Sequence, residues 1–443
     1  MRGQVVTVAL IVASAIATYV TMAGAYKSIQ RAQDDYYTRY HFADIFAQLK
    51  RAPNSVAAEI TDIPGVSVVQ TRVVVEVNLD VPGLDEPAVG RLVSIPEHQS
   101  PMLNGLFLRK GRYIDPERRD EVLASEAFAS ANHLEIGSSI SAVVNGRREE
   151  LRIVGIALSP EYVYEIRGAE VFPDNRRFGV LWMSREALGP LFNMEGGFND
   201  VVITVAPGAS EAGVIERLDK LLEPYGGLGA YGRDDQISHR FLTDEITQDR
   251  ITGVLIPSIF LGIAAFLIHV VLARLVSTQR STIGLLKAFG YSHITVGVHY
   301  LKFAVFTVML GTVVGSPLGI WLGRGLARMY QSFFRFPELQ FVAGPKLIFW
   351  GIAISGVAAC LGAVSSLRAV VTLPPATMAL PRFCVTASCR KFCPSALVGR
   401  TPSRAARSRT SAGPSSPSVT RTTCLSPCRG VEARKLDSAD LTS

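Results

Sequence analysis

Cysteine is scarce in this chain, and most of it lies at one end. Only six of the 443 residues are cysteine, five of them follow Arg382, and residues 27–250 contain none. Disulfide bonds are therefore excluded from that region. The late cysteines have the spacing of no common zinc site, and no histidine follows Arg382 to complete one. We predict no metal site.

Motifs of catalytic and nucleotide-binding sites are missing as well. The chain has no GxxxxGK[ST] phosphate-binding loop, no HExxH zinc motif and no GxSxG nucleophile motif. A GxGxxG pattern at Gly227, Gly229 and Gly232 follows an amphipathic helical segment rather than a strand. We interpret it as a helix end followed by turns. We predict no catalytic residue and no cofactor bound by this chain.

The net charge of +7 is unevenly distributed along the chain. Residues 27–250 hold 24 basic and 34 acidic residues, a net charge of −10, so the remainder carries +17. The basic excess lies beside apolar runs and in the C-terminal tail, which is a pattern of membrane-flanking segments. We therefore predict a membrane and no nucleic acid among the partners of this protein.

Four apolar runs are present instead, and their positions define the organisation of the chain. They are Val5–Ala25, Ile251–Val276, Phe303–Leu322 and Leu347–Val364. A helix of about 20 apolar residues is long enough to cross a bilayer. We predict membrane spans at residues 1–26, 251–276, 296–323 and 347–370. Four spans return the chain to its starting side, so the block at residues 27–250 lies on the side opposite to both ends.

The orientation follows from the short loop at residues 277–295. Basic residues without acidic neighbours lie in or beside it, and such loops stay in the cytoplasm; they are Arg274, Arg280 and Lys287. Basic residues in the external loop at residues 324–346 oppose this orientation. The first run could instead be a cleaved signal peptide, because Ala23-Gly24-Ala25 has a cleavage-site pattern. The run is too long for that and only Arg2 precedes it, so we predict an uncleaved span.

The block at residues 27–250 has the pattern of an α+β domain. We expect a mixed α/β part at residues 27–107 and 178–250, and a small β-rich part at residues 108–177. Alternating apolar residues predict one long strand over residues 67–81, and Asn145-Gly146 between apolar residues predicts a hairpin. The segment EVLASEAFASANHL at residues 121–134 has the pattern of a short helix. We predict that charged helices lead from the first span into this domain and back into the second.

Small residues and one ionisable residue mark the predicted spans. Gly311, Gly315, Gly319 and Gly323 recur every four residues, which places them on one helix face and permits close helix packing. They predict packing within the chain or, as an alternative, a subunit interface. His269 lies inside the second span, where we expect a neutral histidine that is hydrogen-bonded to another helix.

The segment STQRSTIGLLKAFGY at residues 277–291 resembles the coupling segment of the FtsX-like (MacB-type) ABC transporter permease family. The layout of one span, a large domain and three spans is also similar to that family. The resemblance implies a bundle of four transmembrane helices with a porter-like α+β extracytoplasmic domain between the first and second spans. It also implies a bacterial inner-membrane permease subunit that is not an enzyme and whose partner ATPase binds ATP.

The resemblance further implies which residues contact that ATPase. They would come from a short cytoplasmic helix with an apolar surface and basic flanks: Arg280, Ile283, Gly284, Leu285, Leu286, Lys287, Phe289 and Gly290. The other partners implied are a second permease or a second copy of this chain, and a periplasmic adaptor. The alternative function is a non-transporting envelope scaffold that transmits movement to a cell-wall enzyme or sensor.

The chain departs from the family pattern in three places. Ser281 stands where family members often have glutamate, and only Met1 to Gln4 precede the first span. After Leu373-Pro374-Pro375-Ala376 the sequence becomes a tail rich in Cys, Ser, Arg and Pro at residues 371–443. We hypothesise a frameshift near Thr377, so that the chain would be the first half of a longer member. A disordered cytoplasmic tail is the alternative.

Overall fold

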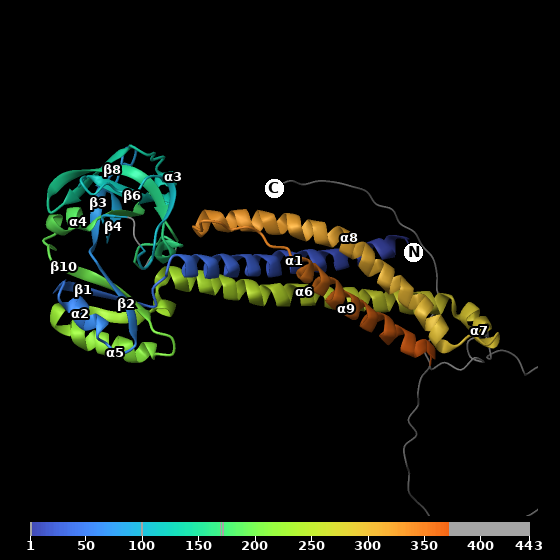
Figure 1. Ribbon diagram of the computed structural model, residues 1–443. Coiled ribbons are helices and arrows are strands. Elements are labelled where there is room, and N and C mark those ends of the chain that lie inside the picture. The colour runs from blue at the N-terminus through green and yellow to red at the C-terminus, as the bar shows by residue number, and fades with distance from the viewer. Residues whose placement is uncertain (1, 99–100, 169, 171, 372–443) are drawn as a thin grey trace, which may run out of the picture. The chain divides into compact units, whose positions relative to one another are not determined.

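The computed structural model describes the chain apart from residues 1, 99–100, 169, 171 and 372–443, so the predicted tail and frameshift lie outside the described residues. A folded domain follows the first long helix in the chain, and the other long helices follow the domain (Figure 1). Within the described residues, four helices are long and apolar enough to cross a membrane. They are α1 (Arg2–Arg39), α6 (Ile237–Thr278), α8 (His293–Phe333) and α9 (Pro345–Val371). The short helix α7 (Arg280–Ala288) connects α6 to α8.

The four-stranded antiparallel sheet of the domain begins directly after α1. Its strand order is β11 (Gly227–Gly232), β1 (Ile45–Pro53), β10 (Gly197–Val205) and β2 (Val66–Arg72). Apolar residues of α2 (Val56–Thr61) and α5 (Glu211–Leu222) share a buried core with this sheet. One face of the sheet is therefore covered by helices, as an amphipathic sheet requires.

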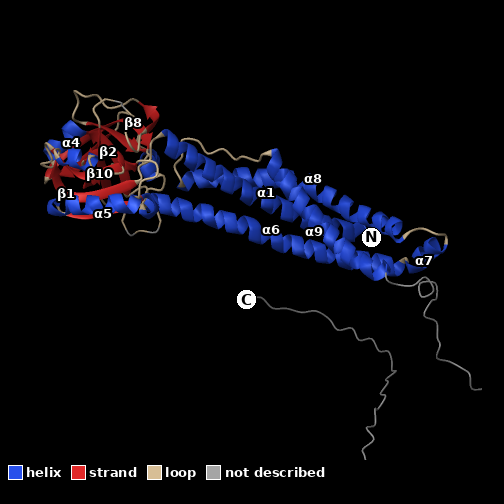
Figure 2. Cartoon of the chain, turned by 60° about the horizontal axis from the view of Figure 1, so that its bottom comes forward, coloured by secondary structure: helices blue, strands red, loops and turns tan. Residues whose placement is uncertain are grey.

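The second sheet has seven strands, which run in mixed directions. Figure 2 shows the strands of the domain in red, with the long helices in blue. The strand order of the second sheet is β5 (Phe107–Gly111), β8 (Arg147–Leu158), β6 (Glu121–Ser125), β9 (Phe178–Ser184), β4 (Ala88–Ile95), β3 (Val74–Asp80) and β7 (Ser139–Val144). The pairs β4–β9 and β6–β8 are parallel, whereas the others are antiparallel. The helices α3 (Glu126–Ala131) and α4 (Arg185–Leu191) contribute to its core.

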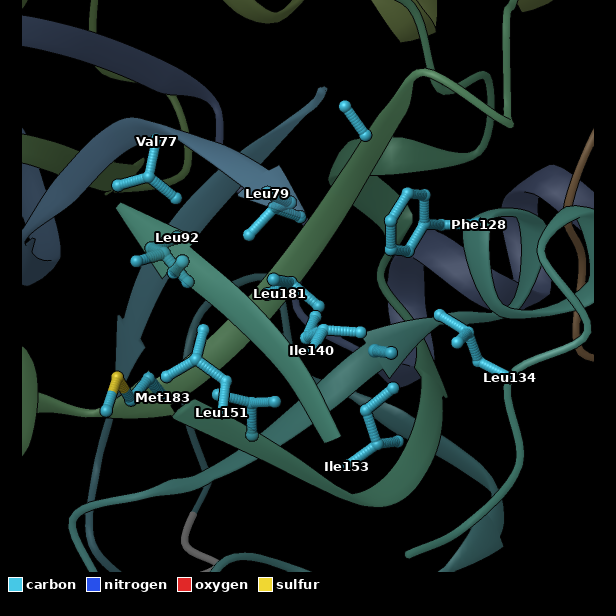
Figure 3. Packing of buried hydrophobic residues seen from close by; sticks show 14 of the residues in the cluster. Val77, Leu79, Leu92, Phe128, Leu134, Ile140, Leu151, Ile153, Leu181 and Met183 are labelled. Carbon is cyan, nitrogen blue, oxygen red and sulfur yellow. The ribbon is translucent and has the colours of Figure 1, made fainter. Parts of the chain in front are cut away.

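The core of the seven-stranded sheet is filled by residues from both helices and strands (Figure 3). Phe128 of α3 lies over β9 at Gly179, where a Cβ atom would overlap the phenyl ring. A residue with a side chain at position 179 would therefore displace Phe128, so glycine is required there for packing rather than for its backbone angle.

Several strands differ from the sequence-based prediction. Residues 67–81 form two strands, β2 and β3, which belong to different sheets. The division at residues 107 and 178 does not follow the sheets. Strands β3 and β9 pair with strands of the predicted β-rich part, and β4 lies between β3 and β9 in the same sheet. Glu121–Ser125 is a strand rather than the start of a helix, since it is buried between β8 and β9. Gly227–Gly232 is an edge strand rather than turns.

Other sequence patterns agree with the structure. Asn145 and Gly146 have positive φ angles of 47° and 78° and connect β7 to β8, as expected for a two-residue hairpin. The charged segments after the first span and before the second are helical in α1 and α6. Helix α8 continues to Phe333, so Arg324 and Arg328 lie on a helix and not in the external loop.

A buried ion network connects the two sheets. Arg72 of β2 donates from Nη1 to Glu161 Oε2 at 2.5 Å and from Nε to Asp200 Oδ1 of β10 at 2.8 Å. Asn104 also donates to Glu161. Burial alone would lower the pKa of Arg72, but the charges of Asp200 and Glu161 raise it above its ordinary value. Arg72 therefore remains charged and compensates two buried carboxyl groups.

The glycines of α8 bring its backbone against α1. A Cβ atom at Gly315 would lie 2.5 Å from the carbonyl oxygen of Ala13, and Gly311 and Gly319 meet other α1 residues at similarly short distances. Gly323 lies against the ring of Phe341 instead. The glycine face is therefore occupied by other parts of the same chain. This agrees with the prediction of packing within the chain rather than with the alternative of a subunit interface.

We expect Arg72→Met to lower the free energy of unfolding by about 3–5 kcal/mol, because it leaves two carboxyl groups buried without their cation. The matched control is Arg148→Met, which removes an ion pair to Asp80 that is mostly exposed. That loss should be about 1 kcal/mol or less. Thermal unfolding of the purified full chain in detergent measures both. Equal shifts in melting temperature would contradict the assigned role of Arg72.

We expect Gly315→Ala to destabilise the protein by about 1–3 kcal/mol, because the added methyl group overlaps the α1 backbone. The control is Gly325→Ala on the same helix, where nothing lies within 4 Å of the new atom. Alanine favours helix over glycine by up to about 1 kcal/mol, so this variant should be neutral or more stable. Changes of opposite sign in the melting temperatures of the two variants support the close packing of α8 against α1. Equal changes exclude it.

Candidate functional site

Helix α7 is anchored to the bundle by one of its apolar residues. Ile283 is buried and shares a core with Val276 of α6 and with Val296 and Tyr300 of α8. The Tyr300 hydroxyl donates to Gln279 Oε1 at 2.7 Å, beside the start of α7. These contacts fix α7 between the ends of the two long helices. Movement of α7 would therefore pull on both.

The other apolar residues of this segment are exposed. Leu285 is 58% exposed, Leu286 37% and Phe289 74%. Gly290, with a φ of 87°, ends the helix immediately after them. The sequence predicted an outward surface that included Ile283 and Gly284, but both are buried. The outward surface consists of Leu285, Leu286 and Phe289, and we call these three residues the α7 patch.

The predicted basic residues lie on the same helix. Arg280 is the first residue of α7 and is half-buried, with an Nε atom that has no hydrogen-bond partner among the described residues. Lys287 lies on α7 between Leu286 and Ala288. The helix therefore combines an apolar surface with basic residues, as the sequence indicated.

His269 is hydrogen-bonded to another helix. Its Nδ1 atom lies 2.8 Å from the hydroxyl oxygen of Ser365 on α9. This agrees with the expectation of a histidine satisfied within the bundle. Among the described residues, no group of three or more His, Cys, Asp or Glu side chains could hold a metal ion.

The segment at residues 159–166, which follows β8, joins the domain to the helices, and we call it the seam. The carbonyl oxygen of Val163 accepts from the Arg335 backbone at 2.7 Å, in the loop between α8 and α9. The Tyr164 backbone donates to Ser238 Oγ of α6 at 2.9 Å, and its ring lies 5.5 Å from that of Phe334. The seam therefore contacts both α6 and the end of α8.

Side chains beside the seam strengthen the same contact. Arg109 of β5 donates to the carbonyl oxygens of Phe336 and Pro337 at 3.0 and 2.8 Å. Glu165 is buried and accepts from the Ser125 hydroxyl at 2.7 Å. Burial raises the pKa of Glu165 to about 7, although the charge of Arg335 opposes the shift. A titratable group thus lies where the domain meets the α8–α9 loop.

A second group of ionisable residues lies between α6 and α8. The Tyr330 hydroxyl oxygen is 2.7 Å from Glu245 Oε1 and 3.0 Å from Asp249 Oδ1. Glu245 and Asp249 belong to the charged segment that was predicted to lead into the second span, and neither residue was singled out from the sequence. Their spacing of four residues, beside an apolar run, was the available signal.

The domain also contains a large cavity. It has a volume of about 850 Å³ and is lined by β2, by the end of β4 and by Tyr37, Thr38 and His41 at the end of α1 and just beyond it. Two charged residues, Arg185 and Glu97, also line the cavity. The end of α1, a helix that continues into the bundle, therefore lines the same cavity as β2, the edge strand of the four-stranded sheet.

Comparison with known proteins gives a family match for the second half of the described chain. Residues 254–375 match the family described as FtsX-like permease C-terminal. This region contains α7 and the α7 patch. No curated protein sequence matches the chain.

Three solved structures are similar to parts of the chain. The periplasmic region of MacB from Actinobacillus actinomycetemcomitans is 11% identical, with 48% of this chain and 95% of that chain covered and a TM-score of 0.30. The extracellular domain of the ABC-type transporter YknZ from Gram-positive bacteria is 11% identical, with coverage of 43% and 98% and a TM-score of 0.29. A domain of a protein described as a permease from Porphyromonas gingivalis is 13% identical, with coverage of 41% and 80% and a TM-score of 0.26.

The family match covers three of the four apolar helices and the connection that carries the exposed α7 patch. Residues 254–375 therefore match the FtsX-like permease family, and one further apolar helix and a β-rich domain precede them in the chain.

Proposed function

We propose that this chain is the transmembrane permease subunit of an ABC transporter and that α7 couples it to a separate ATPase subunit. In this proposal the chain is not an enzyme, and ATP is bound and hydrolysed by the partner. The observation that carries the proposal is the contrast within α7. Ile283 is buried in the bundle, whereas Leu285, Leu286 and Phe289 are exposed.

This contrast suits a helix that transmits force between two proteins. An exposed apolar patch rimmed by charge is typical of a protein-binding surface. Phe289 is the largest of the three exposed side chains and would be the anchor in a partner's groove. Because Ile283 and Tyr300 tie α7 to α6 and α8, a displacement of α7 would reach both helices.

The orientation in this proposal places α7 in the cytoplasm of a bacterial cell. The chain then crosses the inner membrane four times, with the domain outside. The basic residues of α7 fit this side of the membrane. The acidic domain at residues 27–250 contributes little to the choice, since long domains translocate largely regardless of charge.

The movement would reach the domain by two routes. Helices α1 and α6 continue without interruption from their apolar parts to the domain, where Phe42 follows α1 and Gln236 precedes α6. The seam adds a lateral contact to α6 and the α8–α9 loop. Movement of the domain would then export a substrate or extract it from the membrane.

An ABC assembly needs two permease bundles, so we propose a second copy of this chain or a second permease as a further partner. The glycine face of α8 is covered by α1 and is not available for this contact. The exposed apolar residues of α8, among them Phe306, Val313 and Trp321, remain available to a second bundle or to lipid. A periplasmic adaptor would bind the domain.

We expect Leu286→Asp with Phe289→Asp to abolish co-purification of the partner ATPase, because charged side chains replace the apolar contact. The matched control is Phe172→Asp, a change at an exposed phenylalanine in the domain. The full chain is purified from its own host cells in detergent, and the fraction bound to an ABC ATPase subunit is measured. Undiminished binding by the double variant, with a normal melting temperature, would exclude the coupling role.

We expect the seam to make stability depend on pH through Glu165. The folded protein holds a proton on Glu165 up to about pH 7, whereas the unfolded chain releases it near the ordinary pKa of 4.5. Stability should therefore fall as pH rises from about 4.5 to 7, by on the order of 3 kcal/mol. Glu165→Gln should remove this dependence and be the more stable protein at pH 8.

The measurement is the melting temperature of the full chain across this pH range. The control is Glu150→Gln, because Glu150 is exposed on β8 and its replacement should leave the pH profile unchanged. A wild-type profile that stays parallel to that of Glu165→Gln would show that Glu165 ionises freely in the folded protein.

A further inference from the structure

Three oxygen-bearing side chains connect α6 to α8 in a row. Glu245 and Asp249 lie one turn apart on α6, and the Tyr330 hydroxyl of α8 lies between them at 2.7 and 3.0 Å. The row runs from a half-buried residue, Glu245, to a buried one, Asp249, which is only 5% exposed.

The number of protons in this row is informative. A tyrosine hydroxyl has one proton and can donate to one acceptor. If both carboxyl groups were ionised, one of them would lack a donor. Asp249 Oδ2 has no hydrogen-bond partner among the described residues, so an ionised Asp249 would be poorly compensated. An uncompensated buried charge is far more costly than a neutral carboxylic acid.

The arrangement that keeps the more deeply buried acid neutral has Asp249 protonated on Oδ1. Asp249 then donates to the Tyr330 oxygen, and the Tyr330 hydroxyl donates to an ionised Glu245. The two distances agree with this order. The contact to Glu245, at 2.7 Å, has the length of a hydrogen bond to an ionised carboxylate, and the contact to Asp249 is longer at 3.0 Å.

The groups in contact with Asp249 do not compensate an ionised carboxylate fully. Glu245 carries a charge of the same sign, and Tyr330 can donate to only one of the two carboxyl groups. One turn further along α6, Gly253 meets Met22 and Ala23 of α1, which are uncharged. The nearby core consists of apolar and aromatic side chains, including Leu242, Ile246 and Phe334. A metal ion such as Ca²⁺ needs six or more oxygen ligands, and the row has too few.

We propose that Glu245, Tyr330 and Asp249 form a proton relay that carries a proton between the half-buried end of the row and a buried acid between α6 and α8. In the transfer, the Asp249 proton passes from Oδ1 to the Tyr330 oxygen. The proton of Tyr330 passes at the same time to Glu245 Oε1. Asp249 becomes ionised, Glu245 becomes neutral and Tyr330 is unchanged, so charge and protons balance.

The relay would make the contact between α6 and α8 sensitive to proton concentration. After the transfer, Tyr330 donates to ionised Asp249 and accepts from neutral Glu245. When Glu245 then releases its proton to solvent, both carboxylates are ionised and repel each other, and one of them loses its hydrogen bond to Tyr330. Tyr330 also packs against Phe334 at 6.2 Å, and Phe334 packs against Tyr164 of the seam. The protonation state would therefore act on the junction of helices and domain. This inference does not depend on ATPase docking by α7.

Infrared spectroscopy of the full chain in lipid nanodiscs tests the relay at neutral pH. The variants are made in a Glu165→Gln background, which lacks the protonated carboxyl group of the seam. We expect a carboxylic-acid carbonyl band in this background that is lost on adding Asp249→Asn and kept on adding Glu245→Gln. The matched control is Asp244→Asn, because Asp244 is an exposed carboxylate on the same helix and its loss should leave the band unchanged. After transfer to heavy water, exchange of the bound proton shifts this band. We expect Tyr330→Phe to slow that shift at least tenfold.

Each result decides one part of the proposal. A band that persists in Asp249→Asn excludes a proton on Asp249, and a band lost in Glu245→Gln instead reverses the assignment. A rate of exchange that is unchanged in Tyr330→Phe excludes Tyr330 as the carrier. If Asp249→Asn does not fold, Asp249→Glu replaces it; this variant should shift the band, and an unshifted band overturns the proposal.

Discussion

The close approach of α1 to α8 is the constraint on which the rest of the structure depends. Gly311, Gly315 and Gly319 let the two backbones approach to distances that no side chain would permit. In a bilayer such packing is a main source of helix association, because lipid is as apolar as the side chains. The hydroxyl of Thr21 adds a hydrogen bond to the Gly319 carbonyl oxygen at 3.1 Å. The position of α1 in the bundle is thereby fixed.

The fixed position of α1 determines where the domain begins. Helix α1 ends at Arg39 and β1 starts at Ile45, so few residues separate a membrane helix from the centre of the four-stranded sheet. Helix α6 begins directly after β11, the edge strand beside β1, with only a short helical turn between them. The four-stranded sheet is thus held by two continuous helices. The seven-stranded sheet is held through the Arg72 network and the seam.

These connections divide the structure into stiff and adjustable contacts. Backbone packing at the glycines has no side-chain freedom and transmits displacement directly. The seam relies on hydrogen bonds to backbone atoms of Val163 and Phe336 and on a buried carboxyl group, Glu165. Such contacts can be broken and remade with little change in packing. Relative movement of the domain and the α8–α9 loop is therefore easier at the seam than along α1.

The sequence predicted features that depend on local patterns. The apolar runs, the hairpin at Asn145-Gly146 and the helical segments beside the spans are confirmed, because length, turn chemistry and periodicity determine them. The strand pairings were not predictable in the same way. Glu121–Ser125 has a helical composition, yet neighbours distant in sequence on both sides make it a strand. The division of the domain into parts was wrong at β3, β4 and β9 for the same reason.

The site followed the same rule. The residues of the α7 patch were named from the resemblance of residues 277–291 to a permease family. The burial of Ile283 depends on α6 and α8, which that resemblance does not place. Nothing in the local sequence distinguishes Glu165 and Asp249 from the other acidic residues of residues 27–250. Each becomes distinctive only because the fold buries it where a helix meets another element. Buried acids are costly to maintain unless they are neutral or paired. Glu165 lies beside the contact of the domain with the α8–α9 loop and Asp249 lies between α6 and α8, so a change in the protonation of either acid would act on a contact between elements.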